Sequence, residues 1–175
     1  IDDKYAAYEA VQSLIDKGRK KIALVTTVDY VSVGKLRTDG YTKALLDNGI
    51  PFNEDLIIKI EDIDTCEITI GKLLEDKAID AVFAVNELFA VTIIKTANKI
   101  GLNVPNDLAV IAFTDGIISK YSTPTITTVS QSGIKMGNKA AKMLIERLES
   151  EEDEEDENYK TEVIETHLIE RESTN

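Results

Sequence analysis

The residue types that most often carry out catalysis are scarce in this sequence. Cys66 is the only cysteine, and His167 is the only histidine. A single thiol can form neither an internal disulfide nor a cysteine-based zinc site. Serine and cysteine hydrolases generally need a histidine beside the nucleophile. We therefore interpret Cys66 as a small, semi-buried residue at the start of a helix, and His167 as a structural or solvent-facing residue in a late strand.

Acidic side chains are abundant, but they are concentrated in one segment. Residues 149–157 hold eight carboxylates and account for most of the formal net charge of −12. We interpret this run as a solvated, mobile loop between a helix and a final strand. Metal binding is the alternative, but the acids lack the ligand spacing of a calcium loop, and we expect neither a metal site nor a cofactor. An acidic chain in which Lys and Arg do not cluster on one surface is also a poor candidate for binding DNA phosphates.

The sequence lacks the motifs of the common enzyme and membrane classes. It contains no phosphate-binding G-x-x-x-x-G-K-[ST] loop, no G-x-S-x-G nucleophile elbow and no cluster of histidines. No apolar run approaches the ~20 residues that cross a bilayer. We therefore expect neither an enzyme nor a membrane protein. The chain begins without Met or a signal-peptide pattern, close to an apparent helix, which suggests a fragment of a longer protein.

The hydrophobic pattern around these residues alternates between strands and helices. Six stretches are typical of strands, at 21–26, 56–60, 79–85, 108–113, 126–129 and 161–168. Helices are predicted from Asp2 or Asp3 to Ile15, from about Ser32 to Asn48, after Thr65, from Glu87 to Ile100 and from Ser132 to Glu149, with 116–124 irregular. Four apolar strands separated by amphipathic helices predict an α/β fold, with a doubly wound parallel sheet covered on both faces.

Parallel sheets of this kind bind ligands beyond the carboxyl ends of their strands. That rule selects four polar segments, at 27–34, 61–65, 86–87 and 114–116. We expect these segments to lie along one edge of the sheet, and any ligand site to be there.

Six segments, in this order, resemble those of one protein family. They are GRKKIALV at 18–25, LRTDGYTKAL at 36–45, DAVFAVNE at 80–87, GLNVPNDLAVI at 101–111, PTITTVSQ at 124–131 and LIEREST at 168–174. Together they are similar to the lactose-repressor (LacI/GalR) family of transcriptional regulators, with Arg19 in place of the family's usual histidine.

The resemblance implies a two-lobed, periplasmic-binding-protein-like sensor behind an N-terminal helix-turn-helix segment. Residues 1–175 would form part of the effector-binding and dimerisation domain, mostly its second lobe, without the DNA-binding segment and most of the first lobe. The helix at 3–17 and the stretch at 126–149 would belong to the first lobe. We then expect their apolar faces to lack part of their cover, and to pair between chains or become locally disordered.

The resemblance also implies ligand-binding residues. Lys35 matches the position of the family's ligand-binding arginine, although a solvated lysine is equally expected there. Asn86 matches a ligand-facing asparagine, and it can also cap a helix. Thr114 falls where sugar-binding members carry an aspartate that accepts from two hydroxyls, which argues against a typical neutral sugar. The neighbouring Asp115 would point elsewhere. Asp62, or the adjacent Ile63, lies near the loop that covers the ligand.

The expected function is therefore the ligand-sensing and dimerisation domain of a cytoplasmic bacterial regulator, which responds to a sugar or a related small metabolite. It would bind DNA only through the missing N-terminal segment. It would form a homodimer through the helices at 65–77 and 87–100 and the loop at 117–121. A secreted solute-binding protein of similar fold is the alternative, and an enzyme is the third possibility.

Overall fold

The computed structural model describes residues 1–27, 32–149 and 160–175. Most of the acidic run at 149–157, interpreted above as a solvated loop, thus lies outside the described residues. Among the residues that are described, no helix combines the length and the apolar character needed to cross a bilayer.

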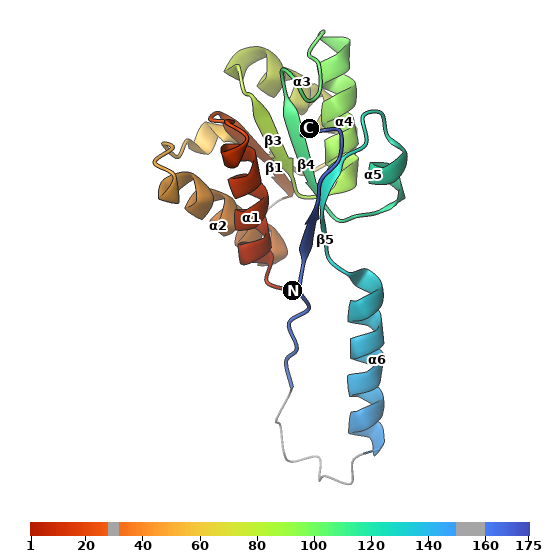
Figure 1. Ribbon diagram of the computed structural model, residues 1–175. Coiled ribbons are helices and arrows are strands. Elements are labelled where there is room, and N and C mark those ends of the chain that lie inside the picture. Colours follow the sequence, from red (N-terminus) through yellow and green to blue (C-terminus); the bar gives the residue numbers. More distant parts are fainter. Residues whose placement is uncertain (28–31, 150–159) are drawn as a thin grey trace.

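In the described part of the chain, a six-stranded sheet forms the centre of the molecule (Figure 1). Its order is β2-β1-β3-β4-β5-β6. The first five strands pair in parallel, and β6 is antiparallel to β5. The strands are β1 (Ile22–Thr27), β2 (Ile57–Ile60), β3 (Ala81–Ala84), β4 (Ala109–Phe113), β5 (Thr127–Ser130) and β6 (His167–Ile169). Every residue of β3 and β4 is buried, because a central parallel strand is covered on both sides.

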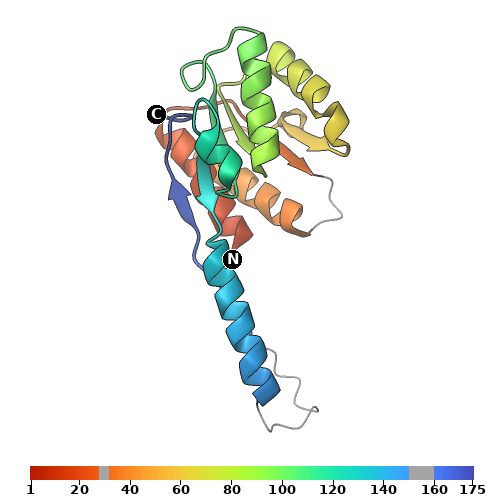
Figure 2. The ribbon, with the colours of Figure 1, turned by 90° about the vertical axis from the view of Figure 1, so that its right-hand side faces the viewer.

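Helices cover both faces of this sheet. The pair α1 (Asp3–Asp16) and α2 (Ser32–Asp47) packs on one face, and the pair α3 (Cys66–Lys77) and α4 (Glu87–Lys99) packs on the other (Figures 1 and 2). Short 3₁₀ helices, η1 (Glu54–Leu56) and η2 (Ile63–Thr65), flank β2. The doubly wound parallel sheet expected from the alternating pattern is confirmed.

The expectation that the first helix lacks cover is wrong. Helix α1 buries Ala6, Ala7, Ala10, Val11 and Leu14, each no more than 2% exposed. It packs along α2 so closely that a Cβ added to Gly40 would lie 2.2 Å from the backbone oxygen of Lys4. The sheet also includes the stretch at 126–130, because β5 pairs with β4. Both segments therefore belong to the main body of this structure.

Helix α6 (Gly133–Glu149) differs from all of these elements. None of its residues is buried, and it extends away from the body (Figures 1 and 2). Its apolar side chains include Ile134 at 86% exposure and Leu148 at 76%. For this helix, the expectation of an uncovered apolar face is confirmed.

Two details of the sequence prediction are wrong. The last strand is limited to β6, so residues 161–166 are not part of the expected strand at 161–168. The stretch at 116–124 contains a short helix, α5 (Ile117–Tyr121). Ser132 directly precedes α6. Its backbone oxygen accepts from the N–H of Met136, and its hydroxyl donates to the backbone oxygen of Glu165 at 3.3 Å.

The residues after β6 form hydrogen bonds with the chain at the start of both β4 and β5. The Ser173 hydroxyl donates to the backbone oxygen of Val110 at 2.6 Å and accepts from the backbone N–H of Thr127 at 2.9 Å. Ser173 also exchanges backbone hydrogen bonds with Val110 and Thr125. Its full burial is therefore accompanied by complete hydrogen bonding, as buried polar groups require.

Candidate functional site

The carboxyl ends of the parallel strands form one edge, and the strand order reverses beside β1. The chain leaves β1 toward β2 on one side and then crosses to β3 on the other. Ligands of doubly wound sheets bind at such a switch point. The described parts of the four polar segments selected from the sequence lie at or after the carboxyl ends of β1, β2, β3 and β4. The structure therefore brings them to the same edge, as expected.

Lys35 lies in the first turn of α2 and is exposed. It follows β1 after residues 28–31, which lie outside the described part of the chain. Its ligand contact remains a prediction.

Asn86 lies two residues beyond the end of β3 and is half-buried. Its side-chain oxygen accepts a hydrogen bond of 2.8 Å from the backbone N–H of Phe89, so it caps α4. The cap expected from the sequence is confirmed. Because the cap uses the amide oxygen, the amide N–H₂ group is the part of this side chain that remains available for a ligand.

Thr114 follows β4 in the left-handed region, with φ of 79°. This conformation is uncommon for a β-branched residue. The exposed hydroxyl accepts a hydrogen bond from Gln131 at 3.3 Å, and the backbone N–H donates to Val129. A ligand that approached this edge could therefore reach the Thr114 hydroxyl.

Asp115 is held in an ion-pair network. Its carboxylate lies 2.6 Å from the Arg171 guanidinium and 3.2 Å from the Lys120 ammonium, and it accepts from the Thr128 hydroxyl at 3.0 Å. Burial would raise the pKa of Asp115, but the hydrogen bonds from Arg171, Thr128 and Lys120 hold it below its usual value. The expectation that Asp115 points elsewhere than Thr114 is consistent with this network.

Asp62 lies beyond β2 and is exposed. Its side chain caps the short helix η2 by accepting from the backbone N–H of Asp64 at 3.0 Å. Its neighbour Ile63 is 48% exposed. Both are at the expected edge, and their contact with a ligand remains a prediction.

The structure adds Arg37, which the sequence interpretation did not select. Its guanidinium donates to Asp3 through Nε at 2.9 Å and to the backbone oxygen of Val85 through Nη1 at 2.9 Å. It also lies 3.6 Å from the centroid of the Phe113 ring. Val85 directly follows β3 and Phe113 ends β4, so this buried cation is placed at the carboxyl edge. Burial lowers the pKa of Arg37, and the hydrogen bond and charge of Asp3 partly offset that effect.

A sequence signal for Arg37 exists. Tyr41, Ala44 and Leu45 form the buried face of α2, and Arg37 precedes Tyr41 by one helical turn. Residues four apart share a helix face. The helical period of the buried residues therefore places Arg37 on the face that is directed toward the core. Leu36 and Leu46 are also apolar, but they lie off this face and are 41% and 59% exposed.

Glu87 fixes the loop that follows Thr114. Its Oε1 accepts from the backbone N–H groups of Gly116 at 2.7 Å and Ser119 at 3.0 Å. A Cβ at Gly116 would lie 2.1 Å from this carboxylate, so only glycine fits here without a shift. The first turn of α4 therefore positions both Asn86 and the segment after β4.

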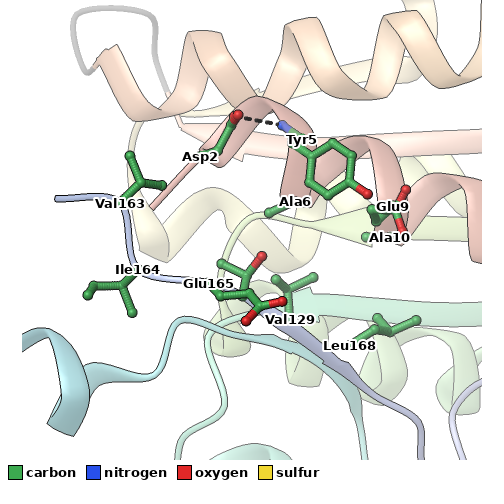
Figure 3. Close-up of a pocket in the computed structure, with 11 residues that line it drawn as sticks. Asp2, Tyr5, Ala6, Glu9, Ala10, Val129, Val163, Ile164, Glu165 and Leu168 are labelled. Atoms are coloured by element: carbon green, nitrogen blue, oxygen red, sulfur yellow. Dashed lines mark hydrogen bonds between the residues drawn. The ribbon is translucent and has the colours of Figure 1, made fainter.

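A separate pocket of about 430 Å³ lies between the first turns of α1 and the segment at 163–168 (Figure 3). Figure 3 shows Tyr5, Glu9 and Glu165 around it, with apolar side chains such as Val129. None of the four predicted ligand residues lines it. In the described residues, no group of three or more His, Cys, Asp or Glu side chains could hold a metal ion.

Comparisons with known proteins agree with this geometry. A family model described as a periplasmic binding protein-like domain matches residues 11–174. The HTH-type transcriptional regulator MalR of Clostridium butyricum is 35% identical over 175 residues, which cover 99% of this chain and 51% of that protein. The chain spans about half the length of the curated relatives with the longest alignments.

Solved structures are similar over the whole chain. The transcriptional regulator CelR in complex with cellobiose has a TM-score of 0.86 at 31% identity, over 99% of this chain and 52% of that one. The transcription regulator CcpA of Lactococcus lactis has a TM-score of 0.87 at 28% identity, over 100% of this chain and 63% of that one.

Proposed function

Since this chain belongs to the periplasmic binding protein-like domain family, in the form found in LacI-family transcriptional regulators, we propose that it is the effector-sensing part of such a regulator. Its effector is a sugar or a related small metabolite. One observation carries the proposal: polar groups lie along the carboxyl edge of the sheet, at its switch point. These groups belong to Asn86, Thr114 and Arg37. We infer a sensor rather than an enzyme, because the relatives are transcriptional regulators.

The chain supplies one lobe of the sensor. The first lobe and a helix-turn-helix segment belong to the rest of the protein, and α6 packs against the first lobe. Effector binding closes the lobes and changes the spacing of two DNA-binding segments in a cytoplasmic dimer, as a shift between two populated states. The names of the relatives give no support to a secreted solute-binding protein.

The ligand assignment is tested on Asn86 in the full-length protein. A thermal-shift screen of sugars and nucleobases identifies an effector, and calorimetry then measures its affinity. Asn86→Ser keeps a capping oxygen but removes the amide N–H₂ group, so we expect weaker effector binding with little loss of stability. Asn98→Ala, at the opposite end of α4, is the control. Unchanged affinity in Asn86→Ser contradicts the assignment of Asn86.

The dimer is the second part of the proposal. Exposed apolar side chains gather on α3, α4 and α5, at Ile68, Leu88, Ile117 and Tyr121. Burying such a patch between two copies removes apolar area from water. We expect light scattering to give a dimer mass, and Ile117→Ser with Tyr121→Ser to lower it. Tyr5→Ser, an exposed tyrosine on α1, is the control. A monomer mass at high concentration contradicts the dimer.

A further inference from the structure

Arg37 and Asp3 form a buried ion pair at the edge that carries the proposed effector site. Both residues are 8% exposed. One carboxylate oxygen of Asp3, Oδ1, lies 2.9 Å from Nε and 2.8 Å from Nη2 of Arg37. In the part of the chain that the structure describes, Asp3 is the only carboxylate within salt-bridge distance of this guanidinium.

The contact uses the side of the guanidinium with which arginine usually binds anions. Two neighbouring N–H groups of arginine match the two oxygens of a carboxylate or a phosphate. In this structure Nε and Nη2 are directed to Asp3, and Nη1 is directed to the backbone oxygen of Val85. The protein's own carboxylate therefore occupies the place that an anionic ligand would take.

The surroundings keep this arrangement in place. The guanidinium lies over the Phe113 ring, and Phe113 is fully buried. Asp3 is fixed by the first turn of α1, which Asp2 caps through the backbone N–H of Tyr5. Removing Asp3 from Arg37 would leave two buried charges without partners, which is strongly unfavourable. An anionic ligand must overcome that cost before it can bind the Nε and Nη2 groups that Asp3 occupies.

We propose that Asp3 is a specificity-determining residue, which blocks the anion-binding side of Arg37 and restricts the site to uncharged, hydroxyl-bearing effectors. A neutral hydroxyl can accept from a remaining N–H of Arg37 and donate to the carboxylate without separating the pair. The pair thus supplies the carboxylate that Thr114 does not. This inference rests on the proposed effector site, and it names the class of ligand that the site admits.

The test uses the chain itself and inorganic phosphate, so it needs no knowledge of the effector. The ¹⁵N–¹H resonance of Arg37 Nε is followed during a phosphate titration at constant ionic strength. In the unaltered chain we expect no saturable shift. In Asp3→Asn we expect the Arg37 Nε resonance to shift saturably with phosphate, because the anion-binding side of the guanidinium is then free of a competing carboxylate. Asp2→Asn removes the same charge from the neighbouring residue and should behave like the unaltered chain.

Two further variants complete the test. Asp3→Asn with Arg37→Gln should lose phosphate binding, measured by thermal shift, because the cation is gone. Asp3→Ser replaces Asp3→Asn if the latter fails to fold, as judged by circular dichroism. Saturable binding of phosphate at Arg37 in the unaltered chain overturns the proposal, and so does a folded Asp3 variant that binds no phosphate. Neither result depends on whether the full-length protein binds an effector, so the failure of the proposed function is seen separately.

Discussion

Helices α1 and α6 both carry apolar side chains but have opposite surroundings. Helix α1 buries Leu14 completely and is packed along α2, whereas α6 leaves Leu144 at 59% exposure and buries nothing. An apolar stripe therefore predicts that a helix needs a partner, but it does not predict whether this chain supplies that partner. For α1 the partner is α2 and the sheet, and for α6 we propose the first lobe.

The largest expected difference between the two helices comes from truncating a leucine. Leu14→Ala opens a cavity in a closed core, so we expect it to lower the free energy of unfolding by about 2–5 kcal/mol. Leu144→Ala on α6 removes no buried contact, and we expect a change within about 0.5 kcal/mol. Urea denaturation followed by circular dichroism measures both. Equal losses in the two variants contradict the comparison.

Enlarging a glycine to alanine also tests whether a helix is packed or exposed, because the added methyl group needs space. At Gly40 the new Cβ meets backbone atoms of α1, and we expect Gly40→Ala to destabilise the chain by about 1–3 kcal/mol through overpacking. At Gly137 the new Cβ meets nothing within 4 Å.

In α6 the helix propensity of alanine then acts alone, and Gly137→Ala is expected to stabilise this helix by roughly 0.5–1 kcal/mol. Thermal unfolding and helix content report both changes. A destabilising effect at Gly137 in this chain would show that α6 is packed against something.

The smallest expected effect concerns the ion pair that ties α6 to the segment before β6. Lys139 lies 2.8 Å from Glu162, and both are partly exposed. The Lys139 hydrogen bond holds the pKa of Glu162 below its usual 4.5. The stabilisation is therefore present above pH 4.5 and is lost as pH falls through the lower pKa of the folded state.

Because exposed pairs contribute little, we expect Glu162→Gln to change Tm at pH 7 by an amount close to the limit of detection. The difference from the unaltered chain should vanish in acid. A Tm loss as large as that of Leu14→Ala would mean that this pair, and with it α6, is part of the cooperative core.

Much of this fold follows from local sequence signals. The apolar runs at 21–26 and 108–113 predicted two buried strands, which the structure has as β1 and β4. The capping side chain of Asn86 predicted the start of α4. The edge that carries the candidate site followed from the parallel order alone.

Other features depend on contacts between distant residues, and the sequence could not show them. Asp3 contacts Arg37 only because α1 packs on α2. The sequence next to either residue contains no signal for that contact. The last strand was predicted too long, because an alternating pattern at 161–166 does not show that only residues 167–169 have a partner strand. The wrong placement of α1 came from the family resemblance rather than from the residues themselves.

The insertion of Ser173 between β4 and β5 has a consequence for biosynthesis. The chain completes the contact between these two strands only after residues 167–174 have been synthesised. At about 5–20 residues per second, translation from β5 to this segment takes roughly a few seconds. During that interval β6 does not yet cover the edge of β5, and an uncovered strand edge is open to pairing with another chain.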